Sequence, residues 1–130
     1  MTFLDSSAII DMLEGVDATV AVIQSRDDQL LTSSICVYEV LDGVLGTGST
    51  DIGAERQRFG GVRAIELTGD LAVEAARLQD ELLADGVRMA ARDCLIAATA
   101  RSTGDQLVVA DADFQTDALE SKIDVTNLRD

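Results

Sequence analysis

The sequence of 130 residues contains no histidine, one lysine and two cysteines. Without histidine, imidazole acid–base catalysis and Ser/His/Asp triads are excluded. Cys36 and Cys94 lie far apart without CxxC spacing, so the sequence indicates neither a zinc site nor a disulfide framework, and we expect two buried free thiols. No stretch approaches the roughly 20 apolar residues of a membrane span, and the start MTFLDSSAII lacks the basic residues of a signal peptide. We therefore expect a soluble, cytoplasmic protein that does not contact membranes.

Basic residues are scarce throughout: 24 Asp and Glu face 10 Lys and Arg, which gives a net charge of −14. Such a charge repels phosphate at low salt. The acids are spread along the chain rather than gathered in a tail, which favours a surface adapted to concentrated salt over an acidic patch for a basic partner. At about 1 M salt the Debye length is only ~3 Å, so the repulsion fades. The composition predicts a protein that needs salt, and it leaves a nucleic-acid substrate open.

Strand-like and helix-like segments alternate along the chain. We expect strands at Thr2 to Leu4, Leu30 to Thr32, Val62 to Leu67, Leu107 to Ala110 and, at an edge, Ile123 to Val125, and helices at Ser7 to Leu13, Ala18 to Ile23, Ile35 to Leu45, Leu71 to Leu83, Ala90 to Ala100 and Phe114 to Leu119. Gly46 to Gly61 is either a mobile loop or a short helix. The alternation predicts an α/β fold with three α/β/α layers and a central parallel sheet of four to five strands. The length and the 47% hydrophobic content fit a single domain over residues 1–130.

Four acids occupy positions that a surface role explains poorly. Asp5 and Asp111 end predicted strands, where parallel α/β sheets bind their ligands. Glu39 and Asp93 lie in apolar helical runs, where a carboxylate is costly unless it is paired, neutralised or bound to a metal. Taken alone, Asp5 and Asp93 are equally well explained as helix N-caps. Asp42, three residues after Glu39, is the most ambiguous acid, since it could share the same helix face.

The four acids together point to a bound cation. Two carboxylates ~4 Å apart repel by about 4 kcal/mol at an effective dielectric of ~20, so such a cluster calls for a positive ion. All-oxygen ligation suits Mg²⁺ or Mn²⁺ rather than zinc. Since the chain has no histidine, a metal-activated water is the natural nucleophile for hydrolysis of a phosphodiester.

Four segments in order, FLDSSAIID, SSICVYEVLDGV, ARDCLIAATA and LVVADADF, resemble the PIN-domain family, most closely the VapC toxins of toxin–antitoxin pairs. The resemblance covers nearly the whole chain and implies a single PIN domain acting as an Mg²⁺- or Mn²⁺-dependent endoribonuclease. It implies that four acids bind the metal and take part in catalysis: Asp5, Glu39, Asp93 and Asp111. A fifth acid, Asp113, is implied to assist in binding the metal. Ser7 matches a hydroxyl position beside the first acid and is expected to contact the substrate. Arg88 and Arg92 lie close to Asp93 and could contact RNA, although solvated helix-face residues are an equal alternative.

The chain departs from the family pattern at Val109, where members commonly carry a threonine two residues before the fourth acid. The missing hydroxyl is expected to affect the catalytic rate more than metal binding. Gly46 to Gly61 also looks short for the family's protruding helical clip.

The resemblance further implies a homodimer that a small antitoxin silences. A carboxylate cluster attracts a guanidinium, which pairs bidentately with a carboxylate. We expect a basic residue of the antitoxin in the acidic crevice and an apolar stretch of it in a groove near Ile9 to Leu13 and Val37 to Val44.

Three other functions are alternatives to a metal-dependent ribonuclease. A PIN fold that only binds a partner is the main alternative, because sequence does not show turnover. A response-regulator receiver domain needs a phosphoacceptor Asp after its central strand and a lysine after its last strand, whereas here the central strand ends at Leu67 and Thr68, and Lys122 precedes the last apolar segment. A haloacid-dehalogenase phosphohydrolase needs a second Asp where this chain has Ser7.

Overall fold

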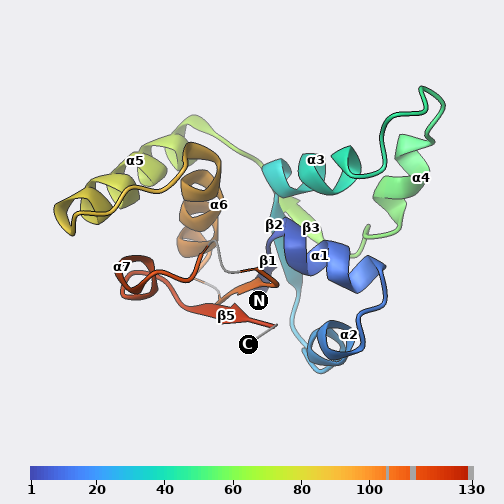
Figure 1. Ribbon diagram of the computed structural model, residues 1–130, viewed down its shortest axis with the longest axis horizontal. Helices are drawn as coiled ribbons and strands as arrows, with labels where there is room; N and C mark the ends of the chain where they lie inside the picture. Colours follow the sequence, from blue (N-terminus) through green and yellow to red (C-terminus); the bar gives the residue numbers. More distant parts are fainter. Residues whose placement is uncertain (105, 112–113, 129–130) are drawn as a thin grey trace.

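Five parallel strands form one sheet in a computed structural model of the chain, in the order β3-β2-β1-β4-β5 (Figure 1). The structure describes residues 1–104, 106–111 and 114–128. The strands are β1 (Thr2–Leu4), β2 (Leu30–Ser33), β3 (Arg63–Ile65), β4 (Gln106–Val109) and β5 (Val125–Asn127). The expected α/β fold with a parallel sheet is confirmed. The sheet has five strands, where four to five were expected.

Helices cover both faces of this sheet. They are α1 (Ser6–Leu13), α2 (Asp17–Gln24), α3 (Ser34–Asp42), α4 (Ile52–Gln57), α5 (Gly69–Ala84), α6 (Ala91–Ser102) and α7 (Asp117–Glu120). Helices α1 and α2 and the segment after α4 pack on one face, and α5, α6 and α7 on the other. Helix α3 serves both, because Cys36 joins one apolar cluster and Val40 the other. The expected three layers are therefore present.

The central strands β1 and β4 are mostly apolar because both of their faces are buried. Successive side chains of a strand point to opposite faces. Phe3 accordingly packs with the α5 and α6 side, and Leu4 with the α1 side. In β4, Leu107 and Val109 face the first side and Val108 faces the second. This explains why these strands read as short continuous apolar runs rather than as alternating ones.

The direction in which strands are added to the sheet reverses between β1 and β4, while all strands stay parallel. After β1 the chain adds β2 and then β3 on one side, and it then crosses through α5 and α6 to add β4 and β5 on the other side. In open α/β sheets the ligand crevice lies outside the carboxyl ends of the strands at such a switch point. Asp5 follows β1 directly, and Asp111 comes two residues after β4. The topology therefore brings these two acids to the same place.

The stretch between Gly46 and Gly61 contains the short helix α4, so the helix alternative is the correct one. Asp51 caps this helix, because its Oδ1 accepts a hydrogen bond of 3.0 Å from the Ala54 N–H. Phe59, just beyond the helix, is 2% exposed in the core on the α1 face. The burial of one aromatic ring thus anchors a segment with little other apolar content.

Several predicted boundaries are wrong by two or three residues. The third helix ends at Asp42 instead of Leu45, and Gly43 is its C-cap. The last strand is Val125–Asn127 instead of Ile123 to Val125, because Ile123 is 7% exposed in the core beside α7 and the pairing with β4 begins only at Val125. Pairing partners, which fix the ends of a strand, cannot be read from a single sequence.

Both cysteines are buried free thiols, as expected. None of the helices in the described part of the chain combines the length and the apolar character that crossing a bilayer takes.

Candidate functional site

Asp5 lies at the end of β1 and is the N-cap of α1. Its side chain is 2% exposed, and its Oδ1 accepts a hydrogen bond of 2.9 Å from the Ala8 N–H. The Ser7 hydroxyl lies 2.7 and 2.8 Å from the two carboxylate oxygens and donates to them, while its oxygen accepts a bond of 2.9 Å from the Ala110 N–H. Ser7 therefore ties Asp5 to the end of β4. Contact between Ser7 and a substrate stays a prediction, and the structure adds a positioning contact with Asp5.

The pKa of Asp5 is raised to about 7, first because the carboxyl is buried and second because Asp111 and Glu39 are negatively charged. The hydrogen bonds from Ala8 and Ser7 act in the opposite direction, because they stabilise the charged form. A carboxylate that is desolvated and surrounded by other carboxylates is one that a cation would stabilise. The N-cap role of Asp5 and its place in an acidic cluster are thus compatible.

Glu39 projects from α3 toward the same place. Its side chain is 18% exposed and accepts a hydrogen bond of 3.4 Å from the Ser6 hydroxyl. Burial raises the pKa of Glu39, the Arg92 guanidinium lowers it, and the charges of Asp93 and Asp111 raise it. Arg92 Nη1 lies 2.8 Å from Glu39 Oε2.

Asp93 lies in the first turn of α6 but is not its N-cap. Ala90 holds the cap position, without a side-chain hydrogen bond. The cap alternative is therefore right for Asp5 and wrong for Asp93. An acid in the first turn is favoured by the helix dipole. Arg92 Nη2 lies 3.5 Å from Asp93 Oδ1, so one guanidinium contacts acids from two helices.

Asp111 is held by β5. Asn127 Nδ2 donates to the Asp111 carbonyl at 2.8 Å and to Gln115 Oε1 at 2.7 Å, which fixes the segment after β4. Sequence reasoning missed Asn127, since an asparagine in a short edge strand carries no signal until its partner is known. Asp113 lies outside the described residues.

The four predicted acids Asp5, Glu39, Asp93 and Asp111, which we call the acidic edge, act on one another electrostatically. Of the two arginines expected near these acids, Arg92 contacts Glu39 and Asp93. Arg88 is exposed before α6, and Asp42 is exposed at the end of α3. Val109, at the position where a threonine was expected, is fully buried in the core.

The chemistry of the acidic edge fits a divalent metal, since four carboxylates provide the hard oxygen ligands of Mg²⁺ or Mn²⁺. Within the described residues, no three acidic or thiol side chains converge closely enough to hold one ion together. The positive charge present there is the Arg92 guanidinium on Glu39 and Asp93. The four carboxylates are thus chemically suitable as metal ligands, and two of them, Glu39 and Asp93, contact the Arg92 guanidinium.

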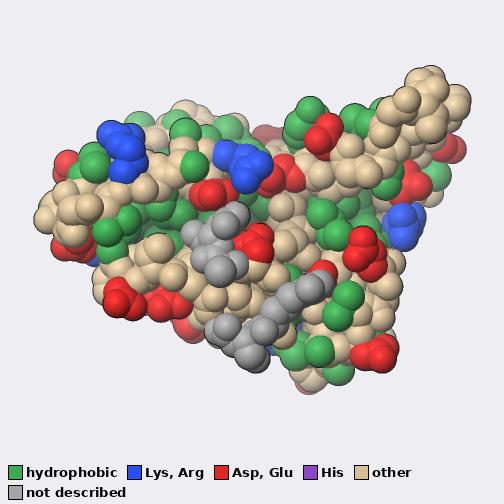
Figure 2. Space-filling model, in the orientation of Figure 1, with side chains coloured by type: hydrophobic (Ala, Val, Ile, Leu, Met, Phe, Trp, Pro, Cys, Tyr) green, Lys and Arg blue, Asp and Glu red, His purple; other side chains and the backbone are tan. Residues whose placement is uncertain are grey.

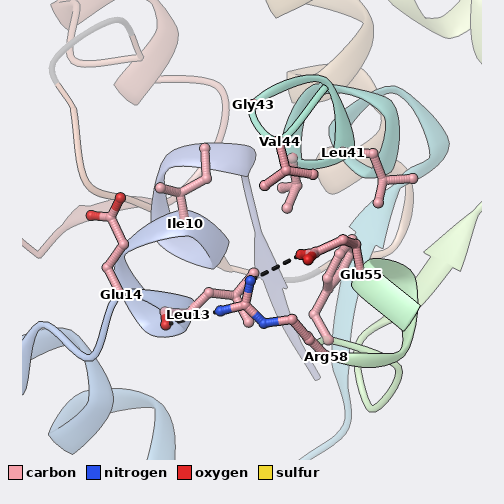
Figure 3. A pocket seen from close by; sticks show the side chains of 10 residues that line it. Ile10, Leu13, Glu14, Leu41, Gly43, Val44, Glu55 and Arg58 are labelled. Carbon is pink, nitrogen blue, oxygen red and sulfur yellow. Dashed lines mark hydrogen bonds and ion pairs between the residues drawn. The ribbon is translucent and has the colours of Figure 1, made fainter. Parts of the chain in front are cut away.

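A second feature lies on the other side of α1. A hollow of about 140 Å³ opens between α1, α3 and the segment around α4 (Figure 3). We call it the apolar groove; its lining residues are Ile10, Leu13, Glu14, Val40, Leu41, Gly43, Val44, Glu55, Arg58 and Phe59. Arg58 crosses it, with Nη1 2.9 Å from Glu55 Oε2 and Nη2 3.5 Å from the Leu13 carbonyl oxygen. The groove overlaps both ranges expected to take an apolar partner.

Acidic side chains are scattered over the surface seen in Figure 2, with few basic groups between them. No single acidic tail or block stands out on this face.

The topology and the acids at the switch point define an α/β protein that gathers carboxylates at the carboxyl ends of its central strands. The family model described as PIN domain matches residues 2–118, and the chain belongs to this family. The resemblance carried by the four sequence segments is thereby confirmed. No curated protein matches the sequence.

Similar solved structures are toxin–antitoxin complexes. FitAcB from Neisseria gonorrhoeae is 23% identical, with a TM-score of 0.77 and coverage of 98% of this chain and 98% of that chain. The DNA-bound VapBC from Salmonella typhimurium is 18% identical, with a TM-score of 0.78 and 98% coverage of both chains. VapBC-5 from Mycobacterium tuberculosis is 28% identical, with a TM-score of 0.64, and 98% of this chain and 97% of that chain are covered.

Proposed function

We propose that this protein is a metal-dependent endoribonuclease and the toxin of a toxin–antitoxin pair. The observation that carries the proposal is the buried Asp5, with a pKa raised to about 7, in electrostatic contact with Glu39 and Asp111 at the switch point. Strongly perturbed carboxyls in a crevice are typical of functional sites. The membership in the PIN-domain family supports a nuclease rather than another α/β enzyme.

Asp5, Glu39, Asp93 and Asp111 are the residues that would hold Mg²⁺ or Mn²⁺. A bound divalent ion supplies an activated water and neutralises charge on the phosphate. The protein's own contribution is orientation. Ser7 and the Ala8 N–H fix the Asp5 carboxylate, and Asn127 fixes the segment that carries Asp111. The β1 and β4 ends are thus joined by hydrogen bonds, which keep the two acids at one place.

The site works against a strong background charge. With a net charge of −14, the protein repels RNA unless salt screens the surface. We therefore propose that RNA cleavage requires concentrated salt. The buried hydrogen-bonded acids are less affected by salt than the surface, because their fields pass through protein rather than solvent.

For the partner, we propose a small antitoxin that places an apolar segment in the apolar groove and a basic residue at the acidic edge. The groove supplies an apolar floor with charged groups at its rim, which suits an amphipathic helix. Solved structures similar to the chain include a toxin–antitoxin complex from Klebsiella pneumoniae, which supports an antitoxin as the partner. We also propose a homodimer, from the family resemblance alone. Stoichiometric inhibition of cleavage by the partner is the expected observation.

The decisive experiment measures cleavage of a structured RNA at about 1 M salt, with Mg²⁺ or Mn²⁺ and with EDTA. Asp5→Asn and Asp93→Asn should each lower the rate by at least about 100-fold, because a ligand charge is lost at constant side-chain volume. Asp42→Asn is the matched control, since it removes the same charge from an exposed position on α3.

Two outcomes would contradict the proposal in different ways. Wild-type rates in both ligand variants would show that the assigned residues are wrong. Absence of any metal-dependent cleavage by the wild-type protein would favour the alternative, a PIN fold that only binds a partner.

A further inference from the structure

One guanidinium occupies the acidic edge. Arg92 lies in the first turn of α6 and reaches Glu39 Oε2 on α3 at 2.8 Å and Asp93 Oδ1 at 3.5 Å. Its side chain is 58% exposed, whereas the side chains of Glu39 and Asp93 are 18% and 15% exposed. The cation therefore sits at the rim, and the carboxylates that it contacts lie deeper.

The position of Arg92 is not explained by the stability of its own helix. A cation in the first turn of a helix is disfavoured by the helix dipole. The guanidinium instead has two carboxylates beside it, with Glu39 Oε2 at 2.8 Å and Asp93 Oδ1 at 3.5 Å. The contact with Glu39 thus compensates the local repulsion within the acidic edge.

We propose that Arg92 is an internal counter-ion of the acidic edge, whose guanidinium must leave Glu39 before a divalent cation can use that carboxylate. The inference rests on the proposed metal site, and it adds that Arg92 competes with the metal. Two of the four acids face this competition, whereas Asp5 is held by Ser7 and Ala8 and does not contact Arg92 in the described structure.

The proposal gives Arg92 a role opposite to that of an ordinary cation near a metal site. If Arg92 merely held Glu39 in place for the metal, its loss would weaken metal binding. If it competes, its loss frees Glu39 and strengthens binding. The sign of the change in metal affinity therefore separates the two roles.

The test is calorimetric titration of Mn²⁺ into the wild-type protein and into Arg92→Gln, Arg88→Gln and Asp5→Asn. Arg88→Gln is the matched control, because it removes the same charge four residues away from an exposed side chain that forms no ion pair in residues 1–104, 106–111 or 114–128. Arg92→Gln should bind Mn²⁺ with a Kd about three- to tenfold lower than Arg88→Gln.

Two further measurements sharpen the result. The gap between Arg92→Gln and Arg88→Gln should persist at about 1 M salt, because a contact at 2.8 Å is screened less than the general field of the protein. Arg92→Lys keeps the charge but loses the planar fork that contacts both acids, so its Kd should fall between those of wild type and Arg92→Gln.

A Kd for Arg92→Gln that equals or exceeds that of Arg88→Gln would overturn the inference while leaving the metal site intact. If the wild-type protein shows no saturable Mn²⁺ binding, or if Asp5→Asn does not weaken it, the proposed site itself is wrong and the inference falls with it. Far-UV circular dichroism of each variant verifies that it is folded.

Discussion

The acidic edge and the apolar groove share helices α1 and α3, but burial has opposite effects on their free energies. Helix α1 begins with Asp5 at the edge and carries Ile10 and Leu13 into the groove. Helix α3 places Glu39 at the edge and the next residue, Val40, in the groove. The edge collects charges whose burial costs free energy, whereas the groove collects apolar surface whose burial releases it.

Helices α1 and α3 thus contribute both to a charged region and to an apolar one. The edge gathers negative charges, two of which contact the Arg92 guanidinium, so a cation is attracted to this region. The groove needs an apolar occupant and is indifferent to charge, apart from its rim. A partner that fills both regions gains affinity from one and blocks chemistry at the other.

The largest change in stability is expected from a substitution in the lining of the apolar groove. Phe59→Ala should lower the free energy of unfolding by about 3–5 kcal/mol, because the ring is 2% exposed and its loss leaves a cavity. It also removes the cation–π contact with Arg56, whose guanidinium carbon lies 4.7 Å from the ring centroid. Urea denaturation measures the change.

Ile52→Ala is the control for this variant, because Ile52 belongs to the neighbouring helix α4 and is 50% exposed. It should change the free energy of unfolding by no more than about 0.5 kcal/mol. Equal losses in both variants would mean that Phe59 does not form the floor of the groove.

The next largest effect is expected at the acidic edge, where a substitution should raise the free energy of unfolding instead of lowering it. The pKa of Asp5 is raised from 3.8 to about 7 in the folded protein, so the folded state binds a proton more tightly than the unfolded state. The stabilisation from that proton is fully present below about pH 4 and is lost as the pH rises to about 7. In EDTA, Asp5→Asn should therefore be more stable than wild type by up to about 4 kcal/mol at pH 7.

Denaturation curves of wild type and Asp5→Asn between pH 4 and pH 8 measure this difference. The gap should widen between about pH 4 and 7 and then stay constant. A gap that does not depend on pH would show that Asp5 titrates normally. Asp42→Asn, at an exposed position, is the control for the loss of one negative charge.

The smallest effect separates binding at the groove from blocking at the edge. Changing the partner's basic residue to alanine should weaken the complex by only about 1.5–3 kcal/mol, the range for a charge-assisted hydrogen bond. The groove remains filled, so the complex should persist while RNA cleavage returns. Calorimetry of the complex and a cleavage assay on the same samples measure both. Complete loss of binding would mean that the edge, and not the groove, holds the partner.

Much of the fold could be predicted from the sequence. The strand before Asp5 and the strand before Asp111 were recognised because a parallel sheet buried on both faces requires continuous apolar runs. Helix α1 ends where predicted because Gly15, at φ 72°, adopts the left-handed conformation that follows many helix ends. The segments at the chain's C-terminal end were predicted less well, since Ile123 is apolar for core packing rather than for strand pairing.

The sequence by itself determined which side chains are available for chemistry, because their number and type are fixed before folding. The absence of histidine and the four acids led to the hypothesis of a reaction that needs a cation. Only the tertiary structure decided which contacts these acids make. Ser7 turned out to hold Asp5 against the end of β4, Asn127 to hold the segment of Asp111, and Arg92 to bridge Glu39 and Asp93. These contacts join residues from distant parts of the chain, and their distances depend on how the strands and helices pack, which no local pattern encodes.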